Sequence, residues 1–226
     1  MIYDFLKLIK KYDFKDTKRF LLILLYLIPT GCYQMKEILF LGDSLTYGYL
    51  VSWKDAFPNR IQEKLEKDNF KNYTVINAGV PGDTTEMAYY RLEYLIKGYS
   101  QLYLLVVFLG ANDYLQGIPP EITYKYYKNI IEKVQSITQN MIIIEFLPFT
   151  GKVDSYKNIF IRLKKEYPFL VVVPEFFSEI LKKPELLLED QLHPNEKGYQ
   201  IIADKIYPYL KKILKKDTSR NQKSLY

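Results

Sequence analysis

LYLLVVFL, at residues 102–109, is an unbroken run of apolar side chains, and GANDYL follows it directly at residues 110–115. A strand with one solvated face alternates apolar and polar residues, whereas this run predicts a strand buried on both faces, as in a parallel sheet. Four other short runs share this character: Glu37–Leu41 (EILFL), Tyr73–Asn77 (YTVIN), Met141–Phe146 (MIIIEF) and Leu170–Val173 (LVVV). The sequence therefore predicts five strands of one parallel sheet.

The segments between these runs have the spacing of amphipathic helices. Apolar residues recur three or four positions apart at Phe57, Ile61 and Leu65, at Ile130, Ile131, Val134 and Ile137, and at Ile201, Ile202, Ile206 and Leu210. Asp83–Glu86 is typical of a helix start. This alternation predicts an α/β protein with a three-layer doubly wound (flavodoxin-like) fold. Such folds bind ligands beyond the carboxyl ends of their strands, so the residues that follow each strand are the candidates for a site.

Composition excludes several classes of protein. The chain has 226 residues, 48% of them hydrophobic and 26% charged, which is typical of a globular domain and not of a disordered or collagen-like chain. One cysteine cannot form an internal disulfide or a cysteine-rich zinc site, and one histidine disfavours most histidine-based metal sites. We therefore expect no metal.

The net charge of +6 is concentrated at the two ends of the chain. Residues 1–19 carry +3 and residues 210–226 carry +5, which leaves −2 on residues 20–209. A nucleic-acid-binding domain usually carries its basic stripe on the folded part. The distribution disfavours nucleic acid as a partner and fits an anionic membrane surface better.

Four motifs follow predicted strands or lie near the end of the chain: GDSLTYG at 42–48, NAGVPGDTT at 77–85, GANDYL at 110–115 and EDQLHPN at 189–195. None of them is a phosphate-binding loop of the GxxxxGKS/T or GxGxxG type. GDSLTYG is not the GxSxG nucleophile elbow either, because Thr46 stands in place of the second glycine.

Together the four motifs resemble the SGNH (GDSL) hydrolase family, and the resemblance covers about residues 36–210. GDSLTYG, the GDTT after the second strand and DxLHPN are most similar to the bacterial thioesterase, arylesterase and lysophospholipase branch. The resemblance implies a serine esterase that hydrolyses carboxylic esters or thioesters through an acyl-enzyme, without a metal or organic cofactor. It also implies small-molecule substrates: fatty acyl esters, acyl thioesters or lysophospholipids.

By the same resemblance, Ser44 is the nucleophile, His193 the general base and Asp190 the carboxylate that orients the imidazole. An oxyanion hole is implied at the backbone N–H groups of Ser44 and Gly82 and the amide of Asn112. A serine hydroxyl needs a base to remove its proton as it attacks, and the resulting oxyanion needs fixed donors. The chain's single histidine stands where such a site requires its base.

Each of these residues also has a non-catalytic interpretation. Ser44 or Asp43 could cap a helix, Asn112-Asp113 and Pro81-Gly82 could be turns, Glu189-Asp190 could be a solvated acidic run, and His193 a surface residue. Asp43 and Asp113 are expected to support or cap rather than react. The aromatic residues, Trp53 included, are expected in the core.

The substrate class has alternatives too. Tyr114, Leu115, Ile118 and Pro119, and separately Phe146–Phe149, could line an acyl site or pack on the core. The same catalytic residues would serve a carbohydrate O-acetylesterase, for which a shallow polar cleft is expected instead of a long apolar channel. A catalytically inactive, membrane-tethered binding protein is the alternative from another class. Oligomeric state is not predicted.

The first 34 residues have the layout of a targeting segment. Lys18 and Arg19 precede the apolar run Phe20–Ile28, which is typical of a secretory signal and too short to span a bilayer. Gly31-Cys32 resembles a bacterial lipoprotein signal, in which the cysteine is lipidated, although Pro29 departs from the usual pattern.

We therefore expect a leader at 1–34, a hydrolase domain at 35–216 and a polar, disordered tail at 217–226 in an exported, membrane-associated protein. A lipid on Cys32 would hold the domain almost against a membrane, which suits an enzyme that takes acyl substrates from a lipid surface. Two alternatives stay open: an uncleaved, membrane-associated leader, and a cytoplasmic enzyme translated from Met35.

Overall fold

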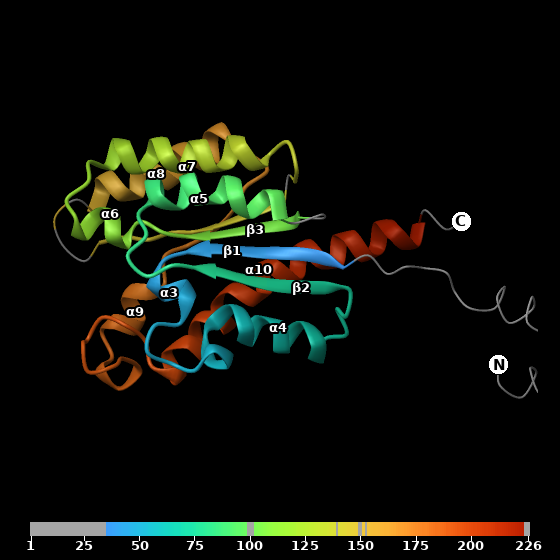
Figure 1. The fold of residues 1–226 in the computed structure, drawn as a ribbon, viewed down its shortest axis with the longest axis horizontal. Coiled ribbons are helices and arrows are strands. Elements are labelled where there is room, and N and C mark those ends of the chain that lie inside the picture. The colour runs from blue at the N-terminus through green and yellow to red at the C-terminus, as the bar shows by residue number, and fades with distance from the viewer. Residues whose placement is uncertain (1–34, 99–101, 139, 149–150, 152, 224–226) are drawn as a thin grey trace, which may run out of the picture. The chain divides into compact units, whose positions relative to one another are not determined.

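Five parallel strands form one sheet in the order β2-β1-β3-β4-β5 (Figure 1). The computed structural model describes residues 35–98, 102–138, 140–148, 151 and 153–223. The strands are β1 (Lys36–Gly42), β2 (Tyr73–Gly79), β3 (Leu102–Phe108), β4 (Met141–Ile144) and β5 (Val171–Val173). Each strand predicted from the sequence is present and differs by at most two residues at either end.

Helices cover both faces of the sheet, as a doubly wound fold requires (Figure 1). Helices α5 (Thr85–Gly98), α7 (Pro120–Val134) and α8 (Val153–Glu166) form one layer, and α4 (Phe57–Lys67) and α10 (Glu196–Lys223) form the other. The short helices are α3 (Ser44–Tyr47), α6 (Ala111–Leu115) and α9 (Phe177–Leu181), with 3-10 turns at η1 (Trp53–Asp55) and η2 (Pro184–Leu186). The predicted three-layer α/β fold is confirmed.

The hydrophobic core lies on both faces of β1 and β3, whose side chains are almost entirely buried. The predicted helical faces at Phe57, Ile61 and Leu65 are fully buried against this core. Two expectations are wrong. Ile137 lies beyond the end of α7 and is 48% exposed, and Trp53 lies in η1 and is 76% exposed instead of packing in the core.

Helix α10 runs past the boundary expected for a disordered polar tail at residue 217 and continues to Lys223. The Asp217 carboxylate explains the difference, because it accepts hydrogen bonds from Lys36 Nζ at 2.5 Å and from the Tyr73 hydroxyl at 2.6 Å. These contacts fix α10, at Asp217, to the starts of β1 and β2. The leader, Cys32 and residues 224–226 lie outside the described residues. No helix within the described ranges is both long and apolar enough to cross a membrane.

The strand order brings the ends of β1 and β3 together. The chain passes from β1 to β2 on one side and then crosses to β3 on the other side of β1. Such a reversal leaves a crevice at the carboxyl ends of the two strands, where ligands bind in this class of fold. Ser44 follows β1 and Asn112 follows β3, so both lie at this crevice.

Candidate active site

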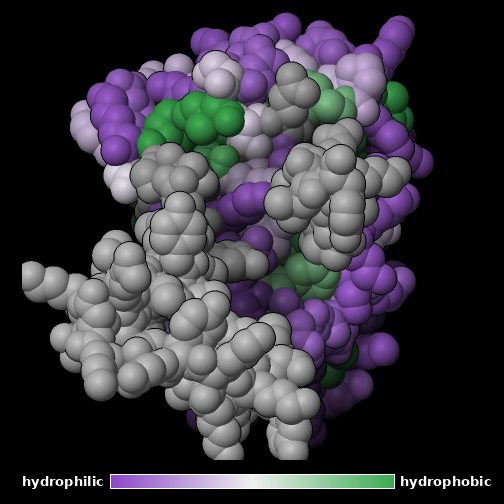
Figure 2. All heavy atoms as spheres, turned by 90° about the vertical axis from the view of Figure 1, so that its right-hand side faces the viewer, coloured by the Kyte–Doolittle hydropathy of each residue, from purple (hydrophilic) through white to green (hydrophobic). Residues whose placement is uncertain are grey.

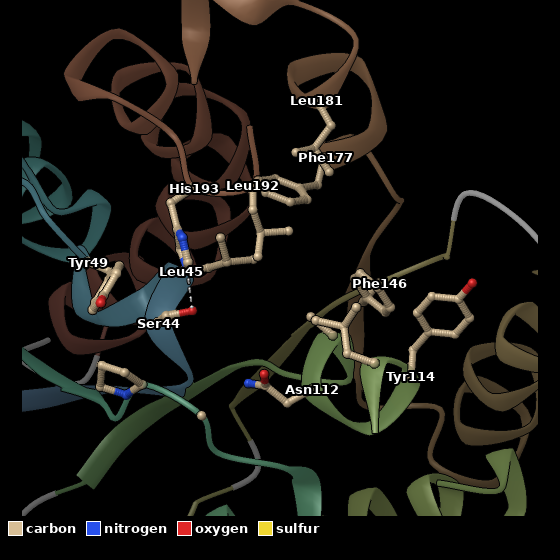
Figure 3. A pocket seen from close by; sticks show the side chains of 14 residues that line it. Ser44, Leu45, Tyr49, Asn112, Tyr114, Phe146, Phe177, Leu181, Leu192 and His193 are labelled. Atoms are coloured by element: carbon tan, nitrogen blue, oxygen red, sulfur yellow. Dashed lines mark hydrogen bonds between the residues drawn. The ribbon is translucent and has the colours of Figure 1, made fainter. Parts of the chain in front are cut away.

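A cavity of about 480 Å³ opens at the carboxyl ends of the strands (Figure 3). Its lining is mostly apolar, with a few polar groups gathered at one side, as is usual for sites that bind small molecules. The lining residues are Ser44, Leu45, Tyr49, Pro81, Gly82, Ala111, Asn112, Tyr114, Leu115, Phe146, Phe177, Leu181, Leu192 and His193.

Ser44 is the first residue of the short helix α3. The side chain of Asp43 caps this helix, since its Oδ1 accepts a hydrogen bond from the Leu45 N–H at 2.9 Å. The helix packs directly on Gly79 at the end of β2, where a Cβ atom would lie 2.2 Å from the Tyr47 nitrogen. A glycine is therefore required there for α3 to sit where it presents Ser44 to the cavity.

His193 and Asp190 reach Ser44 from the loop before α10. The His193 Nε2 atom lies 2.9 Å from the Ser44 Oγ, and its Nδ1 lies 2.6 Å from Asp190 Oδ2. The other Asp190 oxygen accepts the backbone N–H groups of Leu192 and His193, both at 2.9 Å. The carboxylate thus fixes both the loop and the ring, and the structure brings together the three residues that the resemblance selected.

Hydrogen bonding also sets the charge state of Asp190. Partial burial opposes ionisation, but the backbone and ring of His193 and the backbone of Leu192 outweigh it and hold the pKa of Asp190 below its usual value. The carboxylate is therefore an anion near neutral pH. Tyr49 packs on the other side of the imidazole, with ring centroids 4.8 Å apart.

Asn112 faces Ser44 and His193 across the cavity (Figure 3). Its Nδ2 donates to the Asp83 carbonyl at 2.9 Å and lies 3.5 Å from Asp43 Oδ2, a distance at the limit of hydrogen bonding. Gly82 lines the same cavity with φ +87° and open space where a Cβ would stand. The left-handed backbone favours glycine, and the missing side chain leaves the backbone accessible to a ligand.

The loop that carries Gly82 is held by two carboxylates outside the cavity. Asp83 pairs with Arg91 at 2.5 Å, and Arg91 also donates to the Gly42 carbonyl at the end of β1. Asp113 is 1% exposed and accepts the backbone N–H and the hydroxyl of Thr85 at 2.9 and 2.5 Å. The expectation that Asp113 supports the site without reacting agrees with these contacts. Asp83, expected as a helix cap, forms an ion pair instead.

Asp43 is buried beside these two carboxylates. Burial, and then the charges of Asp83 and Asp113, raise the pKa of Asp43 to about 7, although the Leu45 N–H partly offsets them. Asp43 was expected to cap or support the site, and the structure shows the cap. Its raised pKa follows first from burial and then from the two neighbouring carboxylates, which separate loops bring beside it.

The apolar lining was predicted in part. Tyr114, Leu115 and Phe146 line the cavity, whereas Ile118 and Pro119 are not among its lining residues, and Phe149 lies outside the described residues. The other apolar lining residues were not predicted, and they come from separate elements: Leu45, Tyr49, Phe177, Leu181 and Leu192. Leu45 and Leu192 lie within recognised motifs, next to Ser44 and His193, whereas Phe177 and Leu181 lie in no motif. Among the described residues, no group of three or more His, Cys, Asp or Glu side chains is placed to hold a metal ion.

Comparisons with known proteins agree with this geometry. The model of the GDSL-like Lipase/Acylhydrolase family matches residues 40–201. The Escherichia coli (strain K12) protein named thioesterase 1/protease 1/lysophospholipase L1 is 30% identical over 185 residues, covering 80% of this chain and 86% of that protein. An arylesterase of Vibrio mimicus is 28% identical over 197 residues, covering 85% of this chain and 97% of the relative.

A solved structure agrees as well. The psychrotrophic esterase EstA from Pseudoalteromonas sp. superposes with a TM-score of 0.72 at 26% identity, over 80% of this chain and 99% of that one. The family match, the fold and the Ser44–His193 contact thus all indicate a hydrolase that uses serine. The chain belongs to the GDSL-like lipase/acylhydrolase family and is a serine hydrolase that acts on ester bonds.

Proposed function

We propose that Ser44, His193 and Asp190 carry out the hydrolysis of esters and thioesters whose acyl group is apolar. The observation that carries the proposal is the line of contacts from Asp190 Oδ2 through His193 to Ser44 Oγ, which ends at the wall of a mostly apolar cavity. The distances of 2.6 and 2.9 Å are those of hydrogen bonds ready for proton transfer. An inactive binding protein would have no need for this alignment.

The reaction proceeds in two halves. His193 Nε2 takes the proton of Ser44 as Oγ attacks the carbonyl carbon, and Asp190 stabilises the imidazolium that forms. The tetrahedral intermediate collapses, the leaving alcohol or thiol receives that proton, and the acyl group remains on Ser44. Water then attacks the acyl-enzyme with His193 again as base, which releases the carboxylic acid and restores the serine.

The backbone N–H groups of Ser44 and Gly82 and the Asn112 Nδ2 are the proposed donors to the oxyanion. One hydrogen of the Asn112 amide is committed to the Asp83 carbonyl at 2.9 Å, which fixes the orientation of the amide. The other hydrogen faces Asp43 at 3.5 Å, a contact weak enough to be exchanged for a charged oxygen. The donors are thus preorganised before the substrate carbonyl becomes charged.

Two observations support acyl chains over sugar acetates. Phe146, Phe177 and Leu181 add apolar surface beyond the reacting serine, where a carbohydrate would need polar partners. The relatives described above are named thioesterase, lysophospholipase and arylesterase, and none of these names refers to a carbohydrate. Each methylene that enters such a cavity contributes about 0.8 kcal/mol, or roughly fourfold in kcat/KM.

A panel of p-nitrophenyl esters from acetyl to palmitoyl tests the substrate class. We expect kcat/KM to rise from acetyl toward medium chains, and Leu181→Trp to depress the longer esters while sparing the acetate. Ile161→Trp, on an exposed position of α8, is the matched control. A preference for acetate that is indifferent to Leu181→Trp would reject the acyl site and favour the carbohydrate esterase.

Substitution of the serine tests the mechanism. Ser44→Ala should lower turnover by about a million-fold, since loss of a triad serine typically has that effect, while far-UV circular dichroism stays unchanged. A fluorophosphonate should label the wild type once, at Ser44. Ser52→Ala, next to η1, is the control and should keep full activity. Labelling elsewhere, or activity that survives Ser44→Ala, would reject the assignment.

We also propose that residues 1–34 export the protein and that Cys32 receives the lipid that retains it at a membrane. The support is the sequence of the leader: a basic pair, a short apolar run and Gly31-Cys32 close to the first strand.

A further inference from the structure

Lysines gather at the edge of the sheet opposite the cavity. In this fold each long helix runs back against the strands, so helix carboxyl ends collect where the strands begin (Figure 1). The last turns of α4, α5, α7 and α8 all carry lysine: Lys64, Lys67, Lys97, Lys133, Lys164 and Lys165. Lysine at a helix carboxyl end is favoured by the helix dipole, and three of these lysines, Lys64, Lys97 and Lys133, also pair with Asp204 or Glu93.

A net positive charge is found where the end of α4 lies beside residues 211–217 of α10. Residues 64–71 and 211–217, which we term the basic corner, contain seven lysines and three acidic residues, a net charge of +4. Two of the acids are already paired, Asp68 with Lys211 at 2.6 Å and Asp217 with Lys36 at 2.5 Å. Lysines 67, 71, 212, 215 and 216 are all exposed there. Figure 2 views this end of the molecule, where the described surface is mainly hydrophilic.

The mouth of the cavity carries the opposite charge. Residues 175–196, which contain α9 and the loop that presents His193, have six acidic residues and two lysines, a net charge of −4 with the histidine neutral. The described domain is therefore polarised along its strands. An anionic surface attracts one end of such a domain and repels the other, so charge alone would orient it.

The preceding chain joins the domain at the basic corner. Met35 leads into β1 at Lys36, and the Lys36–Asp217 pair joins that strand to α10. The described domain therefore begins at this end of the sheet. Ser44 follows the far end of β1, and the rise from Lys36 to Gly42 is roughly 20 Å.

We propose that the basic corner docks on an anionic lipid surface and that the cavity then opens away from that surface. The occupant follows from charge complementarity, because the basic corner has a net charge of +4 and anionic headgroups attract lysine side chains. The orientation departs from the arrangement expected from the sequence, in which the enzyme takes substrates from its own membrane. Docked this way, the enzyme receives substrates from the aqueous side. This inference does not depend on the proposed acyl specificity.

Vesicle binding by the full chain tests the docking surface. We compare the wild type with the variant Lys71→Gln/Lys212→Gln/Lys215→Gln. Each protein is sedimented with anionic vesicles of phosphatidylglycerol and phosphatidylcholine, and separately with neutral vesicles of phosphatidylcholine alone. Binding to the neutral vesicles measures the contribution of the leader. Each lysine near an anionic surface contributes about fivefold in affinity, so we expect roughly a 100-fold loss on anionic vesicles and little change on neutral ones. Raising the salt to about 0.5 M should remove most of the difference.

The matched control removes three exposed lysines from the cavity end: Lys54→Gln/Lys183→Gln/Lys197→Gln. It should keep wild-type binding, and both triple variants should keep the wild-type turnover of a short soluble ester and the wild-type thermal midpoint. Equal losses for the two triples, or no loss for either, would overturn the proposal. Binding of RNA or duplex DNA by the wild type, lost with the first triple while vesicle binding is unaffected, would assign the corner to nucleic acid instead.

A second measurement tests the orientation. In a Cys32→Ser background, Lys71→Cys and Lys183→Cys are each labelled with a fluorophore, and the protein is bound to anionic vesicles that contain a quenching lipid. The label at position 71 should be quenched, and the label at 183 should stay accessible to iodide in solution. Quenching by lipid at 183 but not at 71 would show that the cavity faces the membrane and would overturn the proposal.

Discussion

At the scale of single residues, Asp43 connects the two halves of the site. One of its oxygens caps α3, which carries Ser44, and the other faces the amide of Asn112. The second contact is long, at 3.5 Å. The Asn112 amide hydrogen that faces Asp43 is therefore only weakly bound and stays available to another acceptor. Side chains that belong to two separate motifs in the sequence therefore lie within reach of one another at the site.

Asn112→Ala should lower kcat by roughly 100- to 1000-fold, since one oxyanion donor contributes about 2.7–4 kcal/mol to the transition state. KM should change much less, because the ground-state carbonyl carries little charge. Steady-state kinetics on one ester measure both constants. Asn158→Ala, on the exposed side of α8, is the control. An Asn112→Ala enzyme altered only in KM would remove this residue from the oxyanion hole.

Asp43 should make stability depend on pH. Its ordinary pKa is 3.8, and burial beside Asp83 and Asp113 raises it to about 7 in the folded protein. Between these values the folded state retains a proton that the unfolded chain has released, so the free energy of unfolding falls as pH rises from about 4 to 7. Below pH 4 both states are protonated and the effect vanishes.

Asp43→Asn should remove this dependence, because asparagine keeps the helix cap and does not ionise. Relative to wild type, the variant should gain roughly 4 kcal/mol of unfolding free energy between pH 4 and pH 8, at about 1.36 kcal/mol per pKa unit. Urea denaturation across this range measures the gain. Asp154→Asn, an exposed carboxylate on α8, should give a curve parallel to wild type. Parallel curves for Asp43→Asn as well would show that Asp43 titrates normally.

At the scale of elements, the sequence predicted what depends on burial and missed what depends on distant contacts. The strands were predictable because burial on both faces leaves a continuous apolar run, as in Leu102–Phe108. Helices α3, α6 and α9 were not, since four or five residues are too short to show a helical period. The end of α10 was missed because Asp217 bonds to Lys36, 181 positions away, and no local pattern records that contact.

Asp217→Asn tests whether this contact fixes the end of α10. The change removes a partly buried ion pair with Lys36 and weakens the bond from Tyr73, which should reduce the free energy of unfolding by about 1–2 kcal/mol. For a chain of this size the melting temperature should fall by roughly 2–8 °C. Glu63→Gln, an exposed charge removal on α4, is the control and should change it by less than about 1 °C. An equal change in melting temperature for the two variants would mean that the Asp217 contacts do not stabilise α10.

At the scale of the whole molecule, the proposed catalytic residues could be selected from the sequence but their spatial arrangement could not. Ser44 and His193 are 149 positions apart and meet only because β1 and the loop before α10 end at the same edge of the sheet. The resemblance supplied that pairing, while residue spacing alone left each side chain with a local interpretation. The separation of charge along the strands is a property of the same kind, because two segments far apart in the chain, 64–71 and 211–217, form the basic corner.

Lipidation of Cys32 would link the proposed docking surface to the location of the protein in the cell. Tyr33–Lys36 span at most about 14 Å, so a lipid on Cys32 would hold the start of β1, and with it the basic corner, at the membrane surface. One acyl chain anchors only marginally, and basic residues beside it supply the second attachment that stable binding needs. Expressed in a bacterial host that processes lipoproteins, the protein should fractionate with membranes, and mass spectrometry should find an N-terminal lipidated Cys32. Cys32→Ser should block processing at Gly31 or release the enzyme, whereas Thr30→Ser should leave both unchanged. A soluble cytoplasmic protein that begins at Met35 would reject export and leave the catalytic argument intact.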